Sequence, residues 1–178
     1  MYLKASSPEE LAFARLIGAS QDYEATVLRK LEECETLQPT AEKAAKWLVM
    51  AANQGSIEAQ IAYATSPEST LGPRPDHESH EFQEWKRNAS SYLYESMQKG
   101  SVDALSALAN AYGTGLIVPR SVVKEYALQM TLERINPAYS SRKHLEELRS
   151  ILTPAQIEEA RKTSKSTYLT LTGNSPDL

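Results

Sequence analysis

Residues 46–64, KWLVMAANQGSIEAQIAYA, recur in altered form at residues 91–109 as SYLYESMQKGSVDALSALA. The two stretches align without a gap when Gly55 is placed on Gly100. The aligned pairs are Trp47 and Tyr92, Leu48 and Leu93, Ser56 and Ser101, Ala59 and Ala104, Ala62 and Ala107, and Ala64 and Ala109. A repeat that joins an aromatic-bearing helix, a Gly-Ser break and an alanine-rich helix is typical of an α-helical solenoid. The sequence therefore predicts an all-α fold of stacked helix pairs.

Composition limits the kinds of partner that this chain can have. It has 178 residues, of which 41% are hydrophobic, and this suits one compact domain better than two. The formal net charge is −4, and the 19 Lys and Arg residues are scattered along the sequence rather than gathered into a basic stripe. Such a chain lacks the positive field that attracts phosphate backbones, so we expect no nucleic-acid partner.

No segment has the pattern of a membrane span. The apolar stretches are much shorter than the about 20 residues that a spanning helix needs, and the opening residues MYLKASSPEE lack an apolar signal-peptide core. The compartment stays open: periplasmic if a signal peptide has been removed, otherwise cytoplasmic. The single cysteine, Cys34, cannot form an internal disulfide and fits the pattern of a small buried hydrophobe.

Helix start and stop signals cover almost the whole sequence. Ser7 and Pro8 begin the first predicted helix, and Thr40 can cap the third. Four helices are predicted in the first part of the chain: Ser7 to Gly18, about Asp22 to the boundary at Pro39, Ala41 to Gly55, and Ser56 to about Thr65.

Residues 65–80, TSPESTLGPRPDHESH, contain three prolines and a glycine and read as an insertion loop between helices. Helical spacing resumes after this insertion. The later predicted helices contain Phe82 to Met97, Ser101 to Tyr112, Val122 to Met130, Leu145 to Ile151, and a last helix opened by the cap Thr153-Pro154-Ala155-Gln156. About eight to nine helices are expected in total.

The repeated phrase resembles the Sel-one-like repeat (SLR) family of the tetratricopeptide superfamily. The resemblance is carried by Ala44-Ala45-Lys46-Trp47-Leu48, Ala51-Ala52-Asn53-Gln54-Gly55-Ser56 and Ala59-Gln60, and by Leu108, Tyr112, Gly115, Val118 and Pro119 after the second copy. Ile117 departs from the family pattern, where a second glycine is usual, and so does Ser121, where an aspartate usually caps the next helix. The resemblance implies a right-handed α-solenoid of antiparallel helix pairs, as found in bacterial scaffold proteins.

These signals predict a single helical-repeat domain over residues 1–178. Its expected parts are an N-terminal helix pair at 1–40, SLR-like repeats at 41–151 with the insertion at 65–80, a capping helix at 152–168 and a frayed tail at 169–178. The last helix resembles the terminal capping helix of many bacterial SLR proteins.

Binding surfaces of stacked helix pairs usually lie on the concave side. By the resemblance, that side is formed by the first helix of each pair. The partner-facing residues would be Glu58, Ile61 and Thr65 in one copy and Asp103, Ser106 and Asn110 in the other. The same residues are also compatible with ordinary solvated helix positions, since helix faces are polar whether or not they bind.

The sequence gives only weak signals for a metal site or a catalytic site. His77 and His80 in the segment DHESH suggest metal ligands, but zinc needs three or four ligands with an organised second shell. His144 fits an exposed helix face, and no nucleophile elbow, phosphate loop or dinucleotide fingerprint occurs. Some cysteine-rich SLR proteins have been credited with enzymatic activity, but they depend on paired cysteines that this chain lacks. We therefore expect no enzyme activity, no catalytic residue, no cofactor and no bound metal.

The aromatic residues and the insertion each have two interpretations. Trp47, Trp85 and Tyr92 recur beside alanines, which favours packing between helices over an exposed binding hot spot. The insertion, with Leu71, Arg74, Asp76 and His77, is either a binding element or a tolerated excursion.

We expect a non-catalytic module that binds a protein or peptide, as an adaptor or scaffold or as a toxin-neutralising, immunity-type protein. The alternative is a small-molecule or metal-binding protein that uses the loop with His77 and His80. The sequence leaves the partner and the oligomeric state open.

Overall fold

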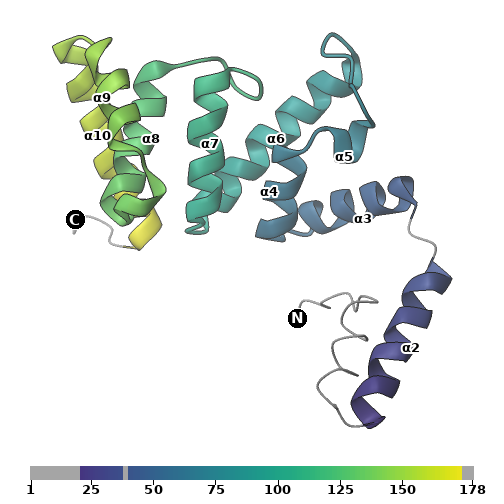
Figure 1. Cartoon of the computed structure of the whole chain (residues 1–178). Coiled ribbons are helices and arrows are strands. Elements are labelled where there is room, and N and C mark those ends of the chain that lie inside the picture. The colour runs from purple at the N-terminus through teal and green to yellow at the C-terminus, as the bar shows by residue number, and fades with distance from the viewer. Residues whose placement is uncertain (1–20, 38–39, 174–178) are drawn as a thin grey trace. The chain divides into compact units, whose positions relative to one another are not determined.

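The computed structural model describes residues 21–37 and 40–173 of the chain (Figure 1), with the side chains of residue 21 and of residues 31–37 left out. Contacts within the chain divide it into two compact units, Met1–Ala44 and Ala45–Leu178. The two units are described separately here, and a single domain stays a prediction.

The first unit is described from α2, Gln21–Leu37, onward. This helix covers the second predicted helix from its expected start near Asp22. The predicted helix at residues 7–18 lies outside the described residues, as does the side chain of Cys34. Helix α3, Ala41–Asn53, starts in the last residues of this unit. Its predicted cap is confirmed, because the amide of Lys43 donates to Thr40 Oγ1 at 3.2 Å.

The second unit is a stack of helices that follow one another closely along the chain. Helix α4 contacts α6 and α7, α7 also contacts α6 and α8, and α8 contacts α9 and α10. In Figure 1, α6, α7 and α8 alternate in direction, as successive members of an α-solenoid do. The residues described contain no strand, and the helices that follow α3 are α4 (Ile57–Thr65), α5 (Glu68–Leu71), α6 (His80–Gln98), α7 (Val102–Thr114), α8 (Val122–Ile135), the 3-10 helix η1 (Pro137–Tyr139), α9 (Arg142–Ser150) and α10 (Pro154–Thr172).

The two Gly-Ser breaks form the same tight turn. Gly55 and Gly100 have φ values of +85° and +89°, which glycine adopts without a steric penalty. The amide of Ser56 donates to the Ala51 carbonyl at 3.1 Å, and Ser101 donates to Ser96 in the same way at 3.1 Å. These are Schellman bonds that satisfy the last carbonyls of one helix. Each serine also caps the next helix, through Oγ contacts of 3.3 and 3.2 Å with the amides of Ala59 and Ala104.

A buried polar cluster joins α3, α4 and α6. Gln60 of α4 is 1% exposed and Ser96 of α6 is 0% exposed. Gln60 Nε2 donates to the Ala52 carbonyl of α3 at 3.2 Å, and Ser96 Oγ donates to Gln60 Oε1 at 2.6 Å. Unpaired polar groups are costly in an apolar interior, so these bonds favour one arrangement of the three helices.

Aromatic packing between α4 and α6 confirms the predicted role of Trp85. This side chain is 1% exposed, and its Nε1 donates to the Tyr63 carbonyl at 3.1 Å. Its ring lies 5.2 Å from that of Phe82. Tyr92 is half-buried, packs edge-on against Tyr63 at 5.1 Å, and donates its hydroxyl to Asn53 Oδ1 at 2.5 Å. Both residues therefore connect one repeat to the preceding one.

The prediction that Trp47 packs between helices is wrong for the described structure. Trp47 is 52% exposed, and Met50 on the same helix is 57% exposed. Tyr92, its counterpart, is covered because α4 lies beside α6. Trp47 lies in the part of α3 that belongs to the second unit, and the other described helices of that unit all follow α3, so the unit supplies no preceding helix pair to cover this position.

The insertion and the C-terminal helix also differ from the prediction. A short helix, α5, occupies part of the predicted loop at 65–80, and its Leu71 packs against the core. Helix α10 continues to Thr172, past the expected end of the capping helix at residue 168. Its predicted capping box is confirmed, since Thr153 and Gln156 exchange both bonds. Thr131 of α8 also donates to Ser164 Oγ at 2.9 Å, which fixes α10 against α8.

We predict that Gln60→Ala lowers the free energy of unfolding by about 2 to 4 kcal/mol, because it creates a cavity, leaves the Ser96 hydroxyl without its acceptor and removes one of the two donors to the Ala52 carbonyl. Thermal and urea unfolding of the full chain measure this. Gln98→Ala, at an exposed position of α6, is the matched control and should change stability by less than about 0.5 kcal/mol. Equal losses in both variants would contradict the structural role of Gln60.

We also predict that Gly100→Ala costs about 1 to 2 kcal/mol, because its φ is in the left-handed region. A Cβ there would lie 3.6 Å from the Leu171 carbonyl oxygen, an ordinary contact, so the cost is conformational rather than a clash. Gly100→Asn should cost less, since asparagine tolerates this conformation better. Urea unfolding of the two variants tests the order, and a more stable alanine variant would rule out the left-handed turn.

Candidate functional site

The six residues predicted to face a partner lie on two neighbouring helices, α4 and α7. Four of them are exposed and two are half-buried. Some are partly engaged locally: Ser56 Oγ donates to Glu58 Oε2 at 3.1 Å, and Thr65 Oγ1 donates to the Ile61 carbonyl at 2.8 Å. We call this set the α4/α7 surface; it consists of Glu58, Ile61, Thr65, Asp103, Ser106 and Asn110.

A groove that sequence reasoning missed lies between α6 and the loop that follows α7. Its cavity volume is about 450 Å³. One wall is a ridge of α6 and the other is the segment from Gly115 to Pro119. We call it the α6 groove, and its lining residues are Gln83, Lys86, Arg87, Ser90, Gly115, Ile117, Val118 and Pro119.

The insertion joins the α6 groove directly. Gln83 Nε2 donates to the His77 carbonyl at 2.8 Å, and the imidazole of His77 stacks on Phe82 with 4.3 Å between ring centroids. Ser79 caps α6, with the Phe82 amide 3.1 Å from Ser79 Oγ. Arg74 has a φ of 57°, in the left-handed region. These contacts hold the end of the insertion against the start of α6.

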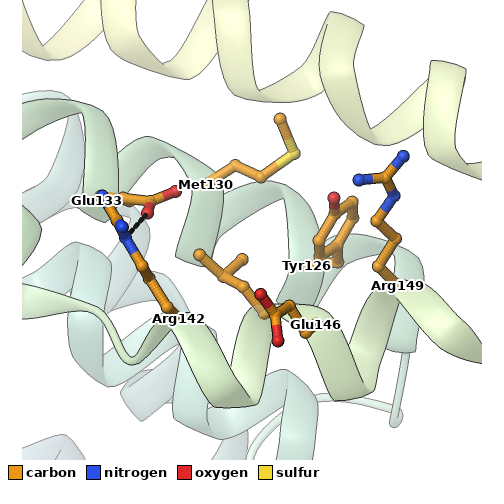
Figure 2. Close-up of a pocket in the computed structure, with 7 residues that line it drawn as sticks. Tyr126, Met130, Glu133, Arg142, Glu146 and Arg149 are labelled. Carbon is orange, nitrogen blue, oxygen red and sulfur yellow. Dashed lines mark ion pairs between the residues drawn. The ribbon is translucent and has the colours of Figure 1, made fainter.

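A second pocket, of about 340 Å³, lies between α8 and α9 (Figure 2). Tyr126, Met130 and Leu145 give it an apolar floor. Its charged residues are of both signs: Arg142 Nε lies 3.6 Å from Glu133 Oε1, and Glu146 and Arg149 line the same space. In Figure 2, Arg149 lies beside Tyr126. Because acids and bases alternate here, the pocket has no strong preference for one sign of charge.

The prediction that His144 lies on an exposed helix face is wrong. It is half-buried, and its Nε2 is 2.9 Å from Glu125 Oε1 of α8. Glu125 is itself buried, and its carboxylate fills the space beside Gly113, where a Cβ would come within 2.8 Å of Oε1. The pair therefore links α8 to α9 and is part of the structure of the stack.

The structure does not assemble a metal site around His77 and His80. Among the described residues, no group of three or more His, Cys, Asp or Glu side chains is placed to hold a metal ion. Asp76 Oδ1 accepts the amide of Glu78 at 3.0 Å, and His77 is stacked on Phe82. In the same part of the chain, no helix is long and apolar enough to cross a membrane.

A tyrosine pair lies where α6, α7 and α8 meet. The hydroxyls of Tyr94 and Tyr112 share a hydrogen bond, and Lys124 Nζ donates to Tyr112 at 3.3 Å. Burial, followed by the hydrogen bond to Tyr112, raises the pKa of Tyr94 to about 12. The neutral phenol is thus the form that the folded chain holds.

Comparison with solved structures gives the fold its name. The structure superposes on the crystal structure of a protective antigen present in uropathogenic Escherichia coli strains, described as displaying an SLR fold, with a TM-score of 0.56. The chain has an SLR fold. The sequences are 18% identical, and the alignment covers 97% of this chain and 37% of that one. No protein-family model and no curated protein sequence matches the chain.

The two departures from the SLR motif have visible consequences in this SLR fold. Ser121 replaces the usual aspartate as a cap, with the amide of Lys124 3.4 Å from its Oγ. Ile117, which replaces a glycine, is half-buried and lines the α6 groove. One of the two departures from the motif therefore forms part of the groove wall.

We predict that the alkaline stability of this SLR-fold chain depends on Tyr94. Because its pKa is about 12 when folded and about 10 when exposed, the unfolded chain loses this proton first. The stabilisation is complete below about pH 10 and is lost as pH rises through about 12. Tyr94→Phe should flatten the fall in urea midpoint across that window, and an unchanged slope would contradict the assignment. Burial also raises the pKa values of Tyr63 and Tyr92, so these two tyrosines add to the loss of stability at alkaline pH.

Proposed function

We propose that this SLR-fold chain is a non-catalytic module that binds another protein or peptide through the α4/α7 surface and the adjoining insertion. The observation that carries the proposal is that α4 and α7 each have one buried face and one exposed polar face. Their inward faces are buried, while Glu58, Thr65, Asp103 and Asn110 remain exposed on neighbouring helices. Polar side chains held on packed helices offer a firm surface for recognition.

The core supports this proposal because it keeps the α4/α7 surface in a set geometry. Gln60 and Tyr63 of α4 are both contacted by residues of α6, and Leu105 and Leu108 of α7 are nearly fully buried. Little reorganisation on binding is therefore needed, and this lowers the cost of association. An adaptor or scaffold and a toxin-neutralising protein would both use such a surface.

The two roles differ in what the bound partner does. A toxin-neutralising protein covers the active surface of its partner, so the partner's activity falls when the complex forms. An adaptor joins its partner to a further protein and leaves that activity in place. Assaying the captured partner alone and in complex separates these roles.

We predict that affinity capture from the native host retains a partner on the native chain and not on the variant with Glu58→Ala, Asp103→Ala and Asn110→Ala. The expected loss is about tenfold or more in affinity if these residues include hot spots. The matched control replaces Gln98, Glu158 and Glu159 by alanine, which makes the same change in charge at exposed positions of α6 and α10. Capture by the first variant as strong as by the native chain would move the site away from the α4/α7 surface.

A further inference from the structure

The α6 groove has a basic side formed by one helix face. Gln83, Lys86, Arg87 and Ser90 follow the i, i+3, i+4, i+7 spacing along α6, so they share that face. Among the ion pairs of the described residues, none involves Lys86 or Arg87. Glu84 lies three residues before Arg87 on the same helix at an exposed position, and no ion pair joins the two side chains. Two cations thus line a groove in a chain of net charge −4.

The opposite side of the α6 groove is apolar and held at both ends. Val118 is 7% exposed, Ile117 is half-buried, and Leu116 beside them is 36% exposed. The amide of Gly115 donates to Ala111 at 2.9 Å, and the amide of Ser121 donates to Tyr112 at 3.1 Å. The loop that forms this wall is therefore fixed to α7 before and after its apolar residues.

A half-buried lysine and an exposed arginine that face an apolar wall favour a particular ligand chemistry. A carboxylate placed near Lys86 and Arg87 gains charge-assisted hydrogen bonds, and an apolar side chain placed against Ile117 and Val118 leaves water. A volume of about 450 Å³ accommodates a few residues of a peptide.

We propose that the α6 groove binds an acidic peptide segment of the partner, in which carboxylates flank an apolar side chain. This inference rests on the proposed function and adds a second contact site to it, with a stated partner chemistry. A nucleic acid is the less suitable polyanion, because it would meet two groove cations on a chain that is acidic overall.

The test begins with selection from a displayed library of random dodecapeptides on the full chain. We expect the enriched peptides to contain several Asp or Glu residues beside a Leu, Ile or Phe. The strongest of them is then synthesised with a fluorescent label, and its affinity is measured by anisotropy. Lys86→Glu with Arg87→Glu should weaken binding by about tenfold or more, because both attractive charges become repulsive. Raising the salt from about 0.05 M to about 0.3 M should weaken the native complex as well.

The matched control is Lys162→Glu with Lys165→Glu, which makes the same charge change at exposed positions of α10. This control should leave peptide affinity unchanged. Equal weakening in both variants would show a non-specific charge effect and overturn the site. Enrichment of neutral or basic peptides, or no enrichment at all, would overturn the proposed chemistry. A labelled single-stranded oligonucleotide that binds the native chain and competes with the peptide would assign the groove to nucleic acid instead.

The same variants distinguish failure of the acidic-segment inference from failure of the proposed protein-binding function. If the charge-reversed variant captures the host partner as well as the native chain does, the acidic-segment inference fails while protein binding stands. If the native chain captures no partner and selects no peptide, both fail together. Circular dichroism of each variant shows whether the helices are retained. Lys86→Gln with Arg87→Gln is a milder variant, and its affinity for the peptide should lie between that of the native chain and that of the charge-reversed variant.

Discussion

The hydrogen bonds of Gln60 are the constraint on which the arrangement of the repeats depends. One amide side chain accepts from Ser96 on α6 and donates to the carbonyl of Ala52 on α3, while its own helix, α4, carries part of the proposed binding surface. Hydrophobic contacts around it tolerate sliding, but two directional bonds in a dry interior do not. The buried Gln60 side chain therefore fixes the position of α4 and, with it, the positions of the exposed side chains of that helix.

Much of the fold could be predicted because its signals are local. The pairs Gly55-Ser56 and Gly100-Ser101 specify a left-handed residue followed by a cap, and both turns form from that information alone. Trp47 could not be predicted in this way. It matches Tyr92 in sequence, yet exposure depends on which helix lies next to a residue, and only Tyr92 has such a neighbour in the second unit.

The α6 groove could not be predicted from the sequence for a similar reason. Its two walls come from segments separated in sequence by the whole of α7, so their contact is tertiary and no local pattern predicts it. A weak local signal existed, since Lys86 has no acidic residue three or four positions away on its helix. Ile117 was recognised as a departure from the SLR motif, but only the structure shows that this departure lines a cavity. The positions of the α4/α7 residues followed from the repeat, whereas their role as a binding surface stays a prediction.

The paired Gly-Ser turns also give the stack two unlike edges. At one edge the α3–α4 and α6–α7 connections have the same short length, which is set by the bonds that end one helix and begin the next. At the other edge, which carries the links from α4 to α6 and from α7 to α8 in Figure 1, connections vary in length and composition. New sequence can enter a repeat there without disturbing its helix hairpin, so this edge is where the molecule is free to diversify, whether by evolution or by grafted loops.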